Sequence, residues 1–251
     1  MDPRLSGDDE RYLFVDSQDM GVTEKRLVWD LPLRIFHWLF ALSIGGSWAT
    51  AEAGFEWMQF HFYLGYFMIG LVVFRVIWGF IGPRHARFSN FLKGPSTLVR
   101  YLKSFGGGEP IVTAGHNPAG GLMVIVMMAM VAFQTATGLF ATDDIAWSGP
   151  YNPAVSGATA SKLTSLHHAN FNWILGAIAL HLLAIGFYWL VKKQNLVAPM
   201  LTGHKPARWV PEHEAIPHSQ LLKALIVILI STGLVYWLIG AAPEPVDEYS
   251  F

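Results

Sequence analysis

Five apolar segments, each long enough to cross a lipid bilayer, constrain this 251-residue chain more than any other feature. They cover residues 33–51, 62–81, 119–140, 168–191 and 221–241, and none of them contains Asp or Glu. An α-helix needs about 20 mostly apolar residues to cross the hydrocarbon core. Charged residues make up 14% of the chain, compared with about 25% in ordinary soluble domains. The sequence therefore predicts an all-α membrane protein.

The Lys and Arg residues are distributed unevenly between these segments. Fifteen of the 17 lie in the N-terminal stretch up to Arg34 or in the segments that follow the second and fourth apolar segments. Because Lys and Arg accumulate on the cytoplasmic side of membrane proteins, we expect these regions to be cytoplasmic. The N-terminus then lies in the cytoplasm and the C-terminus on the outer side.

Composition divides the chain into three parts. Residues 1–26 carry seven acidic residues and lack the features of a cleaved signal peptide, which predicts a polar cytoplasmic extension. Residues 27–206 hold four apolar segments, and residues 207–251 hold a linker, the fifth segment and a short periplasmic tail. Between the segments we expect an amphipathic helix around 96–105, an outer loop at 141–166 and an extended connector at 199–218.

Composition also excludes several kinds of site. The chain has no Cys, so disulfides, iron–sulfur clusters, thiolate metal sites and covalently attached c-type haem are excluded. Its net charge of −1 provides no basic field for a nucleic acid. Ten histidines remain, and several of them lie inside the apolar segments.

Four histidines lie in or beside the apolar segments, where an ionisable side chain marks a candidate functional site. His167 and His181 are 14 residues apart, so both rings share one helix face and lie about 21 Å apart along the axis. The alternating helix directions pair His61 with His167 at the outer side. They pair His37 with His181 at the inner side, although His181 should lie deeper than His37. Paired imidazoles at two depths favour bis-His haem over zinc or copper, and hydrogen-bonded packing is the alternative.

Four stretches of the sequence together resemble one known family. They are Trp29-Asp30-x-Pro32-x-Arg34-x-x-His37-Trp38, His61 with Gly65 followed by Arg75-x-x-Trp78-Gly79, Gly115-His116-Asn117-Pro118-x-Gly120, and His167 with His181 followed by Met200-x-Thr202-Gly203-x-Lys205. Over residues 26–206 their order and spacing resemble the bacterial di-haem cytochrome b family. That family includes membrane subunits of nickel–iron hydrogenases and formate dehydrogenases, and stand-alone cytochromes b.

The resemblance implies a four-helix transmembrane haem bundle, to which this chain adds a fifth C-terminal transmembrane helix. It also implies that His37, His61, His167 and His181 are the axial ligands of two b-type haems. His168 adjoins one of them, but 13 residues instead of 14 would rotate its ring about 100° away from His181, which favours His167. The fifth segment and the N-terminal extension depart from the family's usual pattern.

Four further residues have candidate roles beside the inner haem. Arg75 lies on the helix face of His61, where its guanidinium suits a haem propionate, and snorkelling to the inner surface is the alternative. Arg34 has the same two interpretations, of which snorkelling is favoured. His116 and Asn117 resemble the family's quinone pocket in position, but Asn before Pro also begins a helix well, and we favour this cap.

The remaining polar residues are expected to have structural roles or to be exposed to solvent. Gln134, deep in the third segment, is expected to pack, with a hydrogen bond to another helix or an approach to the outer haem as alternatives. The other histidines considered lie in polar segments and are expected to be solvated: His85, His204, His213 and His218.

The redox interpretation is electron transfer in a bacterial inner membrane, between the quinone pool and a periplasmic-side partner. That partner would be a c-type cytochrome or an oxidoreductase such as a hydrogenase, and the chain would serve quinone reduction or quinol oxidation. A stand-alone quinone-linked superoxide oxidase is an alternative within this class. A non-redox anchor or transporter with structural histidines is the alternative from another class, and the absence of Asp and Glu in the segments argues against it. The fifth segment predicts association with a partner chain or a second copy.

Overall fold

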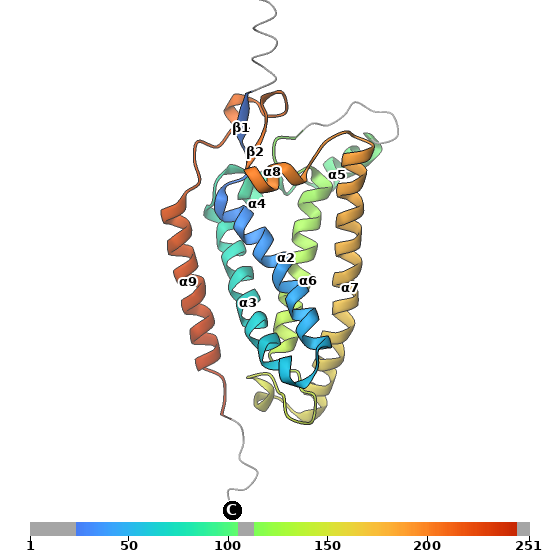
Figure 1. Cartoon of the computed structure of the whole chain (residues 1–251), viewed down its shortest axis with the longest axis vertical. Coiled ribbons are helices and arrows are strands. Elements are labelled where there is room, and N and C mark those ends of the chain that lie inside the picture. Colours follow the sequence, from blue (N-terminus) through green and yellow to red (C-terminus); the bar gives the residue numbers. More distant parts are fainter. Residues whose placement is uncertain (1–23, 105–112, 245–251) are drawn as a thin grey trace, which may run out of the picture.

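A computed structural model describes residues 24–104 and 113–244, so most of the expected N-terminal extension and the end of the tail lie outside it. The long helices are α2 (Leu31–Glu52), α3 (Met58–Ile81), α6 (Pro118–Gly138), α7 (Gly157–Leu190) and α9 (Leu221–Gly240) (Figure 1). The short helices are α4 (Phe88–Phe91), α5 (Pro95–Lys103) and α8 (Val197–Thr202), and the strands are β1 (Lys25–Leu27) and β2 (His204–Pro206). Turns of 3₁₀ helix lie at Phe55–Trp57, Arg84–Ala86, Asn152–Ala154, Ala207–Trp209 and Glu212–Glu214.

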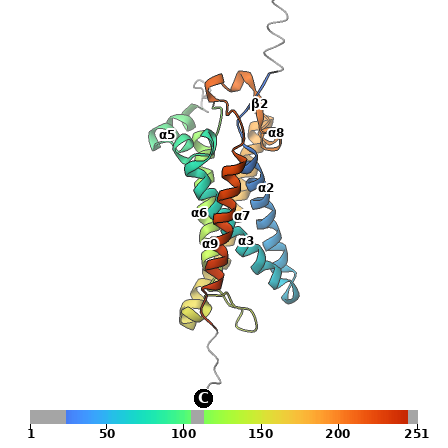
Figure 2. The ribbon, with the colours of Figure 1, turned by 90° about the vertical axis from the view of Figure 1, so that its left-hand side faces the viewer.

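Helix packing leaves an interior bounded by four helices. The closely packed pairs among them are α2 with α3, α3 with α6, and α6 with α7, whereas α2 and α7 do not form such a pair. Helix α9 packs mainly on α3 and lies outside this four-helix bundle (Figures 1 and 2). The expected four-helix bundle with an added fifth helix is therefore confirmed.

Local sequence explains where these helices begin. The Asp30 carboxylate accepts a hydrogen bond from Leu33 N at 2.9 Å and caps α2. It also accepts one from Trp78 Nε1 at 3.1 Å, which fastens the start of α2 to the end of α3. Ser156 caps α7 by accepting from Thr159 N at 3.3 Å. Each cap satisfies backbone donors that a helix leaves without partners in its first turn.

Four helices of the described chain are long and apolar enough to cross a membrane, namely α3, α6, α7 and α9. Helix α2 matches them in length with 22 residues and lies along α3. Polar residues such as Arg34, His37 and Glu52 lower its mean hydropathy, which is why it falls outside this set. Four of the five segments predicted to cross the membrane thus meet the hydropathy criterion. The remaining segment, α2, is placed in the bundle by its packing on α3.

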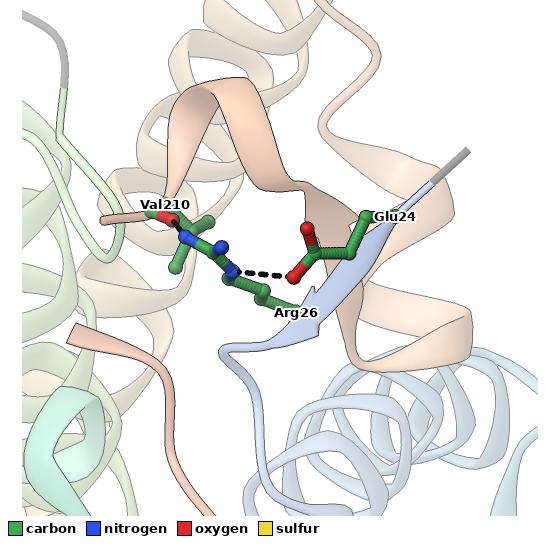
Figure 3. Close-up of polar contacts among 3 residues, drawn as sticks. All are labelled: Glu24, Arg26 and Val210. Atoms are coloured by element: carbon green, nitrogen blue, oxygen red, sulfur yellow. Dashed lines mark hydrogen bonds and ion pairs between the residues drawn. The ribbon is translucent and has the colours of Figure 1, made fainter. Parts of the chain in front are cut away.

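One end of the molecule is rich in Lys and Arg and carries β1, β2, α4, α5 and α8 (Figure 1). This end, which we call the base-rich end, is more structured than the sequence predicted. The segment 199–218 was expected to be extended, but it begins inside α8 and continues as β2, which pairs antiparallel with β1. Gly203, with φ 86°, ends α8, and its carbonyl accepts hydrogen bonds from Val28 N at 2.9 Å and Trp29 N at 3.0 Å. Arg26 also joins Glu24 at 3.0 Å and Val210 O at 2.8 Å (Figure 3).

Two further boundaries test the sequence interpretation. Helix α5, at Pro95–Lys103, confirms the expected amphipathic helix around 96–105, whose last residue lies outside the described residues. Helix α7 begins at Gly157, well before the expected start at residue 168. Its first turns are rich in Ala and Ser with a Lys, so they are too polar to register as a membrane segment, yet the Ser156 cap lets them continue the helix.

Candidate functional site

The two histidines of the predicted outer pair lie close together inside the bundle. The ring centres of His61 on α3 and His167 on α7 lie 6.1 Å apart, with an angle of 77° between the ring planes. His168 is exposed, so the helix turns His167 rather than its neighbour toward His61. The structure thus places together the two residues that the sequence paired.

Backbone carbonyls hold both rings of the outer pair. His61 Nδ1 lies 2.8 Å from the carbonyl oxygen of Ser47 on α2, and His167 Nδ1 lies 3.0 Å from that of Gln134 on α6. Because a carbonyl oxygen only accepts, each Nδ1 carries the proton and donates it. Each Nε2 then keeps its lone pair, which is the tautomer that a metal-ligating histidine requires.

The outer site has a second layer of support from α6 and α7. Asn170 donates to Gln134 Oε1 at 2.7 Å and to Met130 O at 2.9 Å, which confirms that Gln134 hydrogen-bonds another helix. At Gly138 an added Cβ would lie 3.0 Å from Cε1 of His167. A glycine at this position therefore lets α6 approach the imidazole closely.

The predicted inner pair lies nearer the base-rich end. The ring centres of His37 on α2 and His181 on α7 are 6.4 Å apart, and their planes make an angle of 53°. The expected difference in depth between these residues does not keep them apart, because α2 runs obliquely across the bundle (Figure 1). Within the described residues, His37 Nδ1 is buried without a hydrogen-bond partner.

The spacing within both pairs fits an iron held between two imidazoles. An imidazole nitrogen binds a metal ion at roughly 2 Å, so rings on opposite sides of one ion have centres roughly 6 Å apart. The observed values of 6.1 and 6.4 Å match this spacing. No group of three or more His, Cys, Asp or Glu side chains in the described residues could hold a metal ion by itself. Two-ligand sites of this kind suit a metal whose other ligands come from a macrocycle.

Open space lies beside the outer pair at Gly65. Gly65 lies one turn after His61, and a Cβ added there would meet nothing within 4 Å. The donor set, its tautomers and this open face together fit b-type haem.

A buried cationic cluster lies at the base-rich end of the inner pair. Arg75 is 1% exposed, and in the described chain its Nη1 and Nη2 have no hydrogen-bond partner. Its guanidinium carbon lies 5.0 Å from the ring centre of Phe88. The snorkelling interpretation of Arg75 is therefore wrong, because the surrounding aromatic rings close over the guanidinium and keep it from the surface.

His116 lies half-buried in this cluster, with its Nδ1 buried. Its ring centre lies 4.6 Å from that of Trp29 and 4.7 Å from that of Phe91. Burial lowers the pKa of His116 to about 3, and the nearby cations Arg75 and Lys205 add to the effect. Among the described residues its Nδ1 has no partner, so a neutral ring offers one hydrogen-bonding nitrogen to a bound group.

The other two predicted residues at this end bond to neighbouring elements. Arg34 donates from Nη1 to the carbonyl of Leu201 on α8, while its buried Nε has no partner within the described part of the chain. Asn117 accepts from Gly120 N at 2.7 Å, which confirms the expected helix cap. It also donates to the Tyr188 hydroxyl at 2.9 Å.

Sequence patterns missed two charged residues of the cluster. Lys205 is 5% exposed and donates from Nζ to Ala114 O at 2.7 Å, and burial lowers its pKa to about 8. Asp30 is also buried, and burial raises its pKa against the opposing hydrogen bonds from Leu33 and Trp78. Both residues occur in the family-like stretches, but nothing in their spacing shows that they are buried.

One histidine expected to be solvated is buried instead. His85 is 1% exposed and donates from Nε2 to Glu214 O at 2.8 Å, because the linker before α9 folds back over the turn after α3. The others in that group are exposed: His204, His213 and His218.

The sequence comparisons identify the family. Residues 28–203 match the family model described as "Prokaryotic cytochrome b561". The chain is similar to the probable Ni/Fe-hydrogenase B-type cytochrome subunit of Rhodobacter capsulatus, at 24% identity over 236 residues, covering 80% of this chain and 88% of the relative. It is 23% identical over 211 residues to the protein of that description from Rhizobium leguminosarum bv. viciae, covering 71% of this chain and 87% of the relative. No solved structure matches the chain.

Proposed function

The chain belongs to the prokaryotic cytochrome b561 family, and from this premise we propose that it carries electrons across a membrane through two b-type haems. The family and the apolar helices make it a multi-pass membrane b-type cytochrome with a role in electron transfer. The proposal adds the number of haems and their ligands. One haem is held by His61 and His167 and the other by His37 and His181.

A single observation carries this proposal, namely that two imidazole pairs of equal spacing lie inside one bundle. Their ring centres are 6.1 and 6.4 Å apart, and α7 contributes one histidine to each pair. The 14-residue interval from His167 to His181 separates the sites by about 21 Å along α7. Sites at this separation allow an electron that enters near one face of the membrane to leave near the other.

The chain's own residues orient and tune the cofactors. Haem supplies reversible one-electron chemistry at its iron. The carbonyls of Ser47 and Gln134 fix the imidazole tautomers at the outer site and increase the basicity of the ligating nitrogens. At the inner site, Arg75 and Arg34 offer buried guanidinium nitrogens to the haem propionates. A propionate would add negative charge to that of Asp30, the buried carboxyl group of the cluster.

A quinone site beside the inner haem completes the proposed route. The Nδ1 of His116, which has no partner among the described residues, suits a hydrogen bond to a quinone oxygen, and the side chain of Asn117 lies at the same helix entry. We assign the base-rich end to the cytoplasm of a bacterial inner membrane and the C-terminus to the periplasm. The hydrogenase subunits among the relatives support a periplasmic oxidoreductase as partner, and a c-type cytochrome is the other candidate.

Pyridine haemochrome titration of the purified protein, with a reduced-minus-oxidised spectrum, tests the proposal. We expect two b-type haems per chain. Replacing His61 or His167 by Ala should remove one haem, and replacing His37 or His181 should remove the other. His168→Ala is the matched control and should keep both, because that ring is exposed. Two haems per chain in all four single variants would refute the ligand assignment.

A further inference from the structure

A small polar cavity lies at the base-rich end, outside the four-helix bundle. It has a volume of about 290 Å³ and lies between the end of α3 and the start of α9. Four of its lining side chains are Arg, Lys or His, and none is acidic: Arg84, Arg87, His218 and Lys223. We call this cavity the basic pocket.

Neighbouring groups satisfy only part of this positive charge. Arg84 lies 3.6 Å from Glu214 and donates to His213 O at 2.8 Å, so it is largely engaged in the wall. Lys223 donates to Ile81 O at 3.1 Å, which uses one of its three donors. Arg87 is exposed at the rim. The pocket thus retains capacity to bind an anion.

The start of α9 adds to this preference. Gln220 occupies the N-cap position without a side-chain hydrogen bond to the helix, and both Gln220 and Lys223 line the pocket. The first backbone N–H groups of a helix lack partners within the helix and carry partial positive charge. An anion in the basic pocket would lie beside them.

The level of the pocket in the membrane indicates the source of the anion. Two candidate membrane spans end here, α3 at Ile81 and α9 at Leu221, so the pocket lies where the chain leaves the hydrocarbon. Lipid phosphates occupy this level. Below Lys223, the same face of α9 presents Ile226, Ile230 and Leu234, whose side chains are 51%, 47% and 46% exposed. This apolar stripe can receive an acyl chain.

We propose that the basic pocket binds the phosphate of an anionic phospholipid, whose acyl chain lies along the stripe of α9. Basic pockets between membrane helices are suited to acidic headgroups. The lipid would join α9 to α3 by charge at the interface and by apolar contact below it. This proposal depends on the membrane fold and not on haem content.

Binding of defined lipids to the purified full-length protein tests the proposal. We would titrate phosphatidylglycerol and phosphatidylcholine with identical acyl chains and count bound lipids by native mass spectrometry. Phosphatidylglycerol should bind at least tenfold more tightly to the wild type. The double variant Arg87→Gln, Lys223→Gln should lose this preference, because glutamine keeps a donor for Ile81 O but removes the charge.

The matched control is Arg100→Gln, Lys103→Gln, which removes one Arg and one Lys from α5 at the same end. It should bind phosphatidylglycerol as the wild type does, and circular dichroism should show equal helix content in all variants. Equal affinity for the two lipids would overturn the proposal, as would equal loss in the control. Displacement of phosphatidylglycerol by equimolar inorganic phosphate would assign the pocket to free phosphate and overturn the lipid as its source.

Discussion

The two histidine pairs have nearly equal spacing but are held in different ways. At the outer pair, backbone carbonyls from α2 and α6 fix both imidazoles at Nδ1. At the inner pair, His37 Nδ1 has no partner within the described chain, and buried cations lie nearby. The outer site is organised by the helices themselves, whereas the inner site has an excess of positive charge that a bound anionic group would balance. One end of the bundle therefore holds its imidazoles through backbone carbonyls, and the other end offers charge to a bound group.

The largest effect is expected from a substitution that fills the open space beside the outer pair. Gly65→Leu should remove the outer haem and leave the inner one, because its side chain would fill the open face one turn after His61. Haem content should fall from two per chain to one, while circular dichroism shows unchanged helix content. Gly176→Leu is the control: it also meets open space, but nine residues after His167 it faces the opposite side of α7. Unchanged haem content in Gly65→Leu would show that the macrocycle does not occupy this face.

The second largest effect is expected from removing the positive charge of Arg75 near the inner pair. Arg75→Gln should weaken binding of the inner haem by roughly tenfold to a hundredfold, as expected for losing charge-assisted hydrogen bonds of about 1.5–3 kcal/mol. The outer haem should be unaffected. Transfer of haem to an excess of a haem-scavenging apoprotein measures both dissociation rates, and Arg100→Gln on α5 serves as an exposed control. Equal loss from both sites would mean that Arg75 acts on the whole fold.

The third effect concerns pH at the base-rich end. Burial lowers the pKa of Lys205 to about 8 from its ordinary value of 10.5. Between these values the unfolded chain binds more protons than the folded chain, so this lysine makes stability rise as pH increases from about 8 to about 10.5. Thermal unfolding in detergent should show this rise in the wild type relative to Lys205→Met. A difference between the two proteins that stays constant over this range would contradict the burial of a charged lysine.

The smallest effect concerns the entry to α6. Asn117→Ala should lower the free energy of unfolding by about 1 kcal/mol, because it removes the cap on Gly120 N. Asn117→Ser keeps a capping oxygen and should recover most of this loss. If both variants also weaken quinol oxidation equally, Asn117 contributes to a quinone site through its amide and not through the cap. Chemical denaturation and a quinol assay separate these outcomes.

Sequence reasoning succeeded where the information is local or periodic. The 14-residue interval on α7 and the alternating helix directions paired the histidines that the structure brings together. Their role as haem ligands stays a prediction. Sequence reasoning failed at the start of α7 and in the segment 199–218, where a helix cap and a short strand pair override composition. It also failed for His85 and for one interpretation of Arg75, whose burial depends on distant loops and aromatic rings.

By itself, the sequence determined that apolar helices form a membrane bundle and which histidines share a face. These properties follow from hydropathy and from 3.6 residues per turn. Only the tertiary structure decided which groups fix the imidazoles and which charges remain without partners. The partners of His61 and His167 are carbonyl oxygens of Ser47 and Gln134, and every residue type carries the same carbonyl. Their alignment is set by helix packing, which residue identity alone does not encode.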